Sequence, residues 1–212
     1  MSSQAAPSLR RATRAERREQ LLDAADRAIA TDGPDAAMTA IAAEAGSTKP
    51  ILYREFGDKG GLYRALAERH TAALLDELRQ ALATRGGLRE RTRATVGTYL
   101  RLLDEHTGTY RFLMHGEAAA EPAVAGLVTS FIQRVGEVLT AGVRYELGLS
   151  PDDPSMLPAT WAFAITGMCR GAGDWWLARR LAGDETAPSR DDLAEHLTDL
   201  IFGAFPARAV EH

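Results

Sequence analysis

Apolar side chains recur three or four positions apart along almost all of this 212-residue chain, the spacing that gives a helix one buried face. Helix-ending residues interrupt the pattern at intervals, as at Asp32-Gly33-Pro34 and Gly86-Gly87. No segment alternates apolar and polar residues as a half-buried strand does, and no internal repeat is visible. The pattern therefore predicts an all-α protein of about nine helices, over residues 13–30, 38–45, 49–56, 59–83, 88–105, 108–116, 122–148, 155–181 and 190–205.

Residues 38–57 predict two short helices joined by a tight turn. Gly46 follows the first apolar stripe, and glycine is the usual residue just past a helix end. Thr48 is placed to cap the second helix, Pro50 lies in its first turn, and Gly57 ends it. Two helices in this arrangement form a helix-turn-helix, whose second member enters the major groove of DNA.

This stretch resembles the N-terminal DNA-binding domain of the TetR family of bacterial regulators. Two positions depart from the family's pattern. Ala40 replaces a bulkier apolar residue, and Gly60-Gly61 replaces a pair like Glu-Ala, where each glycine costs a helix roughly 1 kcal/mol relative to alanine. The matching residues are Thr39, Ile41, Ala42, Ala45, Gly46, Thr48, Lys49, Leu52, Tyr53, Phe56, Lys59 and Leu62.

The resemblance, together with the distribution of charge, divides the chain into three parts. Residues 1–12 predict a disordered basic arm, since residues 1–18 carry five arginines against one glutamate. The arm could neutralise DNA phosphates or serve only as a solvated tail. A three-helix DNA-binding domain is expected over residues 13–63, with its helix-turn-helix at 38–57. A larger helical domain for effector binding and dimerisation is expected over residues 64–212.

The helix over residues 49–56 is short, so its N-terminal residues are expected to make the base contacts. Threonines near helix N-termini can donate hydrogen bonds to phosphates, where the helix dipole also favours negative charge. The resemblance implies a phosphate contact for Lys59 and a backbone or thymine-methyl contact for Tyr53, which could instead be a half-buried packing residue. The candidate DNA-binding residues are Thr39, Thr48, Lys49, Pro50, Ile51, Tyr53, Arg54 and Lys59.

A single domain of this kind neutralises too few phosphates for specific binding at cellular salt, whereas two copies can read major-groove faces about 34–36 Å apart. We therefore expect a homodimer on double-stranded, palindromic operator DNA. The last two predicted helices carry wide apolar stripes, and Gly167, Gly171 and Gly173 would let another helix come close. The resemblance implies a four-helix bundle built from these two helices of each subunit. The alternative is that their faces pack only within one subunit.

The middle of the chain is rich in aromatic and apolar residues, which could line a cavity or form ordinary core. By resemblance, such a cavity binds a small effector that changes the spacing of the two recognition helices, and the composition favours an apolar or amphipathic molecule. The polar candidates are His106, His115, Glu117, Arg144 and Arg170. The candidate effector-binding residues are Tyr99, Tyr110, Phe112, Met114, Phe131, Trp161, Met168 and Trp175.

Composition argues against several other classes of protein. No apolar run approaches the roughly 18 residues that span a bilayer and the N-terminus lacks a signal core, so a cytoplasmic protein without a membrane partner is expected. The single cysteine, Cys169, excludes an internal disulfide and predicts a buried, inert thiol. We expect no catalytic residue, no metal and no cofactor, because the histidines lack metal-ligand spacing and no P-loop, G-x-G-x-x-G or G-x-S-x-G motif is present.

The sequence thus predicts a DNA-binding transcriptional regulator, by family default a repressor, that a small effector of unknown identity releases from its operator. The alternative is a helical ligand-sensing or adaptor protein of the same fold that does not bind DNA specifically.

Overall fold

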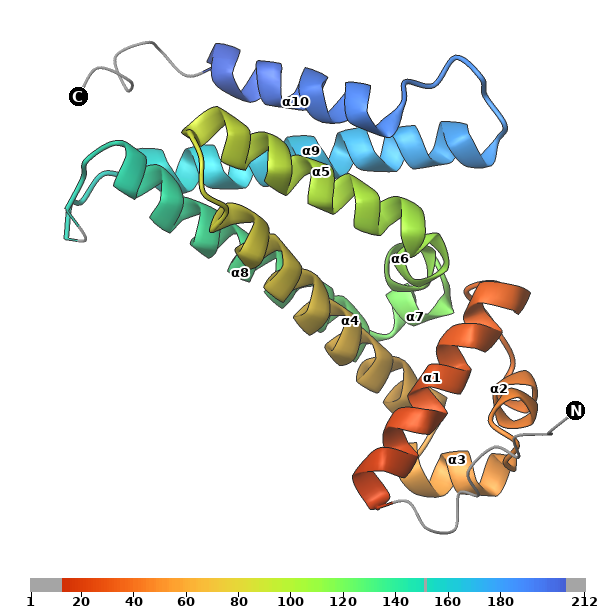
Figure 1. Ribbon diagram of the computed structural model, residues 1–212. Coiled ribbons are helices and arrows are strands. Elements are labelled where there is room, and N and C mark those ends of the chain that lie inside the picture. Colours follow the sequence, from red (N-terminus) through yellow and green to blue (C-terminus); the bar gives the residue numbers. More distant parts are fainter. Residues whose placement is uncertain (1–12, 151, 205–212) are drawn as a thin grey trace, which may run out of the picture. The chain divides into compact units, whose positions relative to one another are not determined.

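The computed structural model describes residues 13–150 and 152–204, and within these ranges every regular element is a helix. The single turn α7 aside, the helices agree in number with the nine predicted from the sequence. None of them is both long and apolar enough to cross a bilayer. The arm predicted for residues 1–12 lies outside the described part of the chain. In order (Figure 1) the helices are α1 (Arg14–Asp32), α2 (Met38–Glu44), α3 (Lys49–Phe56), α4 (Lys59–Leu82), α5 (Leu88–Glu105), α6 (Thr107–Met114), α7 (Glu117–Ala120), α8 (Pro122–Glu146), α9 (Leu157–Leu181) and α10 (Arg190–Ala204).

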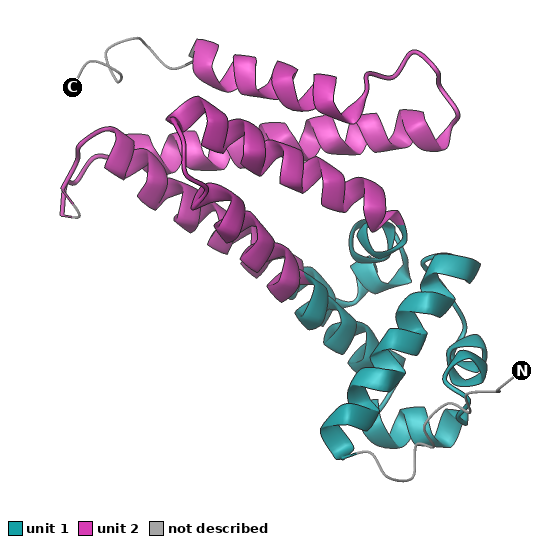
Figure 2. Ribbon diagram, in the orientation of Figure 1, with its two compact units in different colours: residues 1–70, 108–127 teal, residues 71–107, 128–212 magenta. Residues whose placement is uncertain are grey.

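The helices form two compact units (Figure 2). The first contains the described residues up to 70 together with 108–127, and the second contains residues 71–107 and those from 128 onward. Helix α4 therefore contributes its first half to one unit and its second half to the other. The domain boundary that the sequence suggests near residue 63 stays a prediction.

The core of the first unit is formed by apolar faces of α1 to α4. Leu21 on α1, Ile41 on α2, Leu52 on α3 and Leu62 on α4 are each at most 1% exposed. Burial of such a side chain contributes roughly 1.5–3 kcal/mol to folding. This shared core fixes the direction in which the opposite face of α3 points.

A cluster of charged side chains joins α1 to α4 within the same unit. The guanidinium of Arg69 contacts the carboxylates of Glu19, Asp23 and Asp26, and His70 Nε2 lies 2.7 Å from Asp26 Oδ1. Burial by itself would raise the pKa of Asp26. The hydrogen bond from His70 and the charges of His70 and Arg69 outweigh burial, so the Asp26 pKa is lowered.

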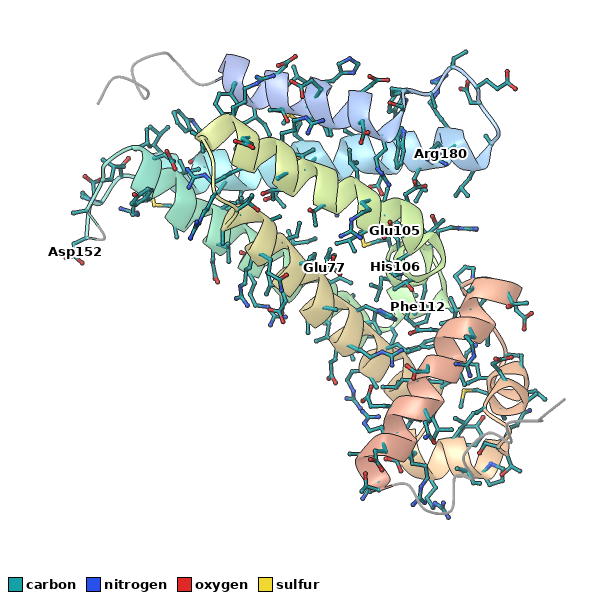
Figure 3. The ribbon with its side chains drawn as sticks, viewed as in Figure 1. Glu77, Glu105, His106, Phe112, Asp152 and Arg180 are labelled. Atoms are coloured by element: carbon teal, nitrogen blue, oxygen red, sulfur yellow. The ribbon has the colours of Figure 1, made fainter. Side chains whose placement is uncertain are left out.

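Helices α6 and α7 also belong to the first unit, although more than 30 residues separate them from the rest of it in sequence. Phe112 on α6 (Figure 3) is fully buried and packs edge-on against the ring of Tyr63 on α4. The backbone of Gly108 approaches α1, where a side chain in its place would lie 3.7 Å from the Cα of Ala30. The segment is thus part of the core around the helix-turn-helix.

In the second unit, α5 packs against both α9 and α10 (Figure 1). Arg89 at the start of α5 forms ion pairs with Glu195 and Asp199 of α10. Trp176 of α9 is fully buried, and its indole N–H donates a 2.9 Å hydrogen bond to the carbonyl of Pro188 in the connection to α10. These contacts fix the last two helices side by side.

Candidate nucleic-acid interface

The turn between α2 and α3 depends on Gly46. Its φ of 56° lies in the left-handed region, and its N–H donates to the carbonyl of Ala43 at 3.0 Å. The N–H of Ser47 donates to the carbonyl of Ala42 at 2.9 Å. This pair of hydrogen bonds is the Schellman motif, which satisfies the last carbonyls of a helix and turns the chain sharply. Helices α2 and α3 are thus joined by a tight turn, the arrangement of a helix-turn-helix.

Helix α3 has one buried and one exposed face. Leu52 is fully buried and Phe56 is 8% exposed, so both belong to the core. Tyr53 is 44% exposed, more than a packing residue would be. The side chains that lie on the exposed face are those of Lys49, Pro50, Tyr53 and Arg54, with Ile51 half-buried beside them.

The N-terminus of α3 offers side chains more than backbone groups to a phosphate. Pro50 has no N–H, and the N–H of Ile51 donates to the carbonyl of Thr48 at 3.0 Å. Thr48 stands at the N-cap without a side-chain capping bond, so the predicted capping role is not observed and its exposed hydroxyl can turn toward DNA. Thr39 is likewise exposed in the first turn of α2.

Two arginines near the start of α1 brace the C-terminal end of α3. The guanidinium of Arg18 lies 4.8 Å from the ring centroid of Phe56, and Arg14 Nε lies 3.4 Å from Glu55 Oε1. The sequence suggested only a general attraction of these arginines to DNA. The spacing of four between Arg14 and Arg18, which places both on one helix face, was the available signal for a shared partner.

Lys59, the predicted phosphate contact at the start of α4, already has a partner. Its Nζ lies 2.5 Å from Glu117 Oε2 and 5.2 Å from the ring centroid of Tyr63. The hydrogen bond to Glu117 and the interaction with Tyr63 raise the pKa of Lys59 to about 12. Glu117 was a polar candidate for the effector cavity in the sequence, whereas the structure places its carboxylate beside a predicted DNA contact.

The departure from the family pattern at Gly60-Gly61 has a structural reason at its second position. A Cβ on residue 61 would lie 1.9 Å from the carbonyl oxygen of Phe56, an impossible overlap. The N–H of Gly61 also donates to Asp58 Oδ1 at 2.6 Å, so Asp58 caps the start of α4. Glycine here lets the end of α3 and the start of α4 meet closely.

The predicted effector residues are distributed over both units. Tyr110, Phe112 and Met114 lie in the first unit, where Phe112 is a core residue. In the second unit Trp175 is 48% exposed, with the guanidinium of Arg179 5.3 Å from its ring centroid. The other predicted residues of that unit, all partly buried, are Tyr99, Phe131, Trp161 and Met168.

An open hollow of about 360 Å³ lies at the connection between α9 and α10. Its lining mixes charged residues with glycine, alanine and proline, and includes none of the predicted effector residues. One lining side chain, that of Arg180 (labelled in Figure 3), is already paired with Asp104. The lining residues are Arg180, Gly183, Asp184, Glu185, Ala187, Pro188 and Ser189.

Helices α9 and α10 leave apolar surface uncovered in the single subunit. Leu200 is 58% exposed, and a Cβ on Gly167 or Gly171 would meet nothing within 4 Å. Gly173 behaves differently, since a Cβ there would lie 2.8 Å from the hydroxyl oxygen of Tyr99 on α5. The close approach predicted for Gly173 is therefore made by a side chain of its own subunit.

Comparison with known proteins agrees with this architecture. Residues 21–66 match the bacterial regulatory proteins of the tetR family, and residues 77–211 match the tetracyclin repressor-like C-terminal domain. The HTH-type transcriptional activator FasR of Mycolicibacterium smegmatis is 40% identical over 168 residues, which cover 79% of this chain and 75% of FasR.

Solved structures show the same fold. A tetR-family transcriptional regulator from Streptomyces coelicolor superposes with a TM-score of 0.72 at 23% identity, over 89% of this chain and 80% of that one. The regulator FadR from Bacillus subtilis, solved in complex with stearoyl-CoA, gives a TM-score of 0.65 at 15% identity, over 89% and 99% of the two chains. Taken with the family matches over both parts of the chain, these likenesses mean that the protein belongs to the TetR family of DNA-binding transcriptional regulators.

Proposed function

We propose that this regulator reads its operator with the exposed face of α3. The observation that carries the proposal is the division of α3 into a face anchored by Leu52 and Phe56 and an opposite face carrying Lys49, Tyr53 and Arg54. A helix with one face fixed in a core can present the other to a major groove without losing its own packing. The hydroxyls of Thr39 and Thr48 would contact the DNA backbone, as would Lys59.

The test compares operator binding by the native chain and by Lys49→Ala/Tyr53→Ala. We expect a loss of about 2–6 kcal/mol per half-site for the double variant, since each good base contact contributes about 1–3 kcal/mol. The matched control is Arg134→Ala/Tyr145→Ala, which removes one exposed cation and one exposed tyrosine from the second unit. Undiminished binding by the Lys49/Tyr53 variant would reject the assignment of the recognition helix.

We propose further that the protein acts as a homodimer through α9 and α10. The exposed Trp175 and Leu200, with Gly167 and Gly171 open to close approach, supply an apolar surface that a second copy would cover. A two-fold symmetric dimer presents its two recognition helices to an inverted repeat. Operator DNA and the partner subunit are thus the expected macromolecular partners, and a bacterial operator would be met in the cytoplasm.

The proposed effector is an apolar or amphipathic molecule, and a long-chain acyl thioester is its leading chemical class. The aromatic content of the middle helices supports this, as does the stearoyl-CoA complex of the structurally similar FadR. A coupling of about 1–3 kcal/mol would change operator affinity about 5- to 150-fold. Thermal shift with stearoyl-CoA, stearate and coenzyme A tests the class, and stabilisation by coenzyme A alone would contradict it.

The direction of regulation depends on where the operator lies relative to the promoter. Repression stays the expectation from the family, and the relative FasR is named an activator. A reporter driven by the native upstream region, with and without the regulator, distinguishes the two. If the protein bound no duplex in the operator-binding test, it would instead be the non-DNA-binding sensor or adaptor.

A further inference from the structure

The ammonium group of Lys59 lies where the proposed interface needs a cation for phosphate, but a carboxylate of the same unit occupies it. Glu117 Oε2 is 2.5 Å from Lys59 Nζ, and 58 positions separate the two residues in sequence. A DNA phosphate and a carboxylate are both anions that accept hydrogen bonds from an ammonium. Glu117 therefore resembles the phosphate that Lys59 would contact on DNA.

Glu117 is held in place from a second side. Its backbone N–H donates a 2.7 Å hydrogen bond to Oδ1 of Asp35, in the connection between α1 and α2. The preceding residue, Gly116, packs so closely that a Cβ there would lie 3.1 Å from Cβ of Pro34. The backbone of residues 116–117 is thus held beside Lys59, which lowers the entropic cost of forming the ion pair.

Further acidic groups surround the same helix end. Asp58 caps α4, and a Cβ on Gly60 would lie 3.4 Å from the carboxyl group of Glu121, at the far end of α7. While Glu117 remained on Lys59, an incoming phosphate would lie beside its carboxylate in a site that is already acidic, and like charges at such distances repel. Glu117 and a phosphate are therefore alternative partners of Lys59.

We propose that Glu117 is an intramolecular competitor of operator DNA, so that Lys59 contacts phosphate only after it leaves Glu117. This competition rests on the proposed function of the α3 face, whose affinity for DNA it would lower. The Lys59 and Glu117 side chains are 36% and 62% exposed, so the ion pair is weak and lowers operator affinity without preventing binding. A small decrease in operator affinity suits a regulator that must bind and release DNA reversibly.

The first experiment measures operator affinity and its salt dependence for Glu117→Gln. Removing the competing charge should tighten binding about 1.5- to 5-fold per protomer, the range expected for an exposed ion pair. The slope of log K against log salt should stay unchanged, because Lys59 neutralises the same phosphate in both complexes once it has left Glu117. The matched control is Asp76→Asn, which removes the same charge from an exposed pair with Arg79. An affinity equal to that of the control, or a slope that changes by a whole phosphate contact, would overturn the proposal.

The second experiment repeats Glu117→Gln in a Lys59→Gln background. If Glu117 acts by holding Lys59, its replacement there should change affinity no more than the Asp76→Asn control does. If Glu117→Gln still tightened binding fully in the absence of Lys59, competition would be overturned, and Glu117 would act only by repelling DNA directly. Equal unfolding midpoints of all variants would exclude a change of fold as the cause. Failure of the native chain to bind any duplex would count against the proposed function, whereas native binding with a silent Glu117→Gln would reject this inference alone.

Discussion

The ring of Phe112 on α6 meets the ring of Tyr63 on α4 edge-on, with centroids 4.9 Å apart and planes at 80°. This geometry is favourable for aromatic pairs, and Phe112 is completely buried in it. A residue that the sequence proposed for an effector cavity thus stabilises the unit that contains the helix-turn-helix. The segment 108–127 is consequently part of the support of α3 and α4.

Phe112→Ala should lower the free energy of unfolding by about 3–5 kcal/mol, because it removes a buried ring and leaves a cavity. Phe112→Leu keeps most of the volume and should cost clearly less. Urea unfolding of both variants measures the difference. A small loss of stability in Phe112→Ala, with a large loss of effector binding, would favour the cavity-lining role instead.

Gly61→Ala should destabilise the protein, although alanine favours a helix over glycine by about 1 kcal/mol. The added Cβ would overlap the carbonyl oxygen of Phe56, so the turn between α3 and α4 must move. Gly60→Ala is the matched control, because its Cβ meets side-chain atoms at 3.4 Å and the helix preference should then dominate. Thermal unfolding compares the two, and equal midpoints would contradict the close approach at residue 61.

Stability in acid should depend on Asp26. Its folded pKa lies below its ordinary value near 3.8, so its contribution is fully present above that value and is lost as the pH falls through the folded pKa. Asp26→Asn should therefore lower stability at pH 7 and flatten the fall in stability below about pH 4. Unfolding in urea at a series of pH values measures both, and an unchanged acid limb would mean that another carboxylate controls it.

The exposed apolar face of α10 should decide the oligomeric state. Leu200→Glu places a charge in the proposed dimer interface, where an unpaired buried charge costs about 3–5 kcal/mol, and should raise the dimer dissociation constant by more than 100-fold. Light scattering at micromolar concentration measures the mass. Leu88→Glu, at another exposed leucine of the second unit, is the control. A dimeric Leu200→Glu protein would exclude this face from the interface.

Cys169 should react slowly with thiol reagents in the folded protein. Burial raises the pKa of its thiol to about 11, so little thiolate exists at pH 8. In denaturant, Cys169 should react with the reagent at the rate of an exposed cysteine in a short peptide. Fast labelling of the native protein would contradict the inert role expected from the sequence.

Local signals account for the parts of the fold and site that the sequence predicted. Gly46 and Gly57 were read as helix ends, and both have positive φ in the structure. Leu52 and Phe56 lie four positions apart, a spacing visible in the sequence, and they form the buried face of α3. These features depend only on a few residues that are neighbours in the chain, so a single sequence is enough to predict them.

Features that depend on distant pairs could not be predicted in this way. Nothing local to Lys59 points to Glu117, and the steric demand at Gly61 appears only once α3 and α4 are placed. The effector residues were chosen by composition, which does not distinguish a cavity wall from a core residue such as Phe112.

Selection of bound fragments from a random duplex library tests the central claim most directly, because it reports specificity and symmetry together. The native chain should enrich an inverted repeat whose half-site centres lie about 10 base pairs or a multiple apart. The Lys49→Ala/Tyr53→Ala variant should fail to enrich the same sequence. A library left unenriched by the native chain, or the same repeat recovered by the variant, would contradict the account.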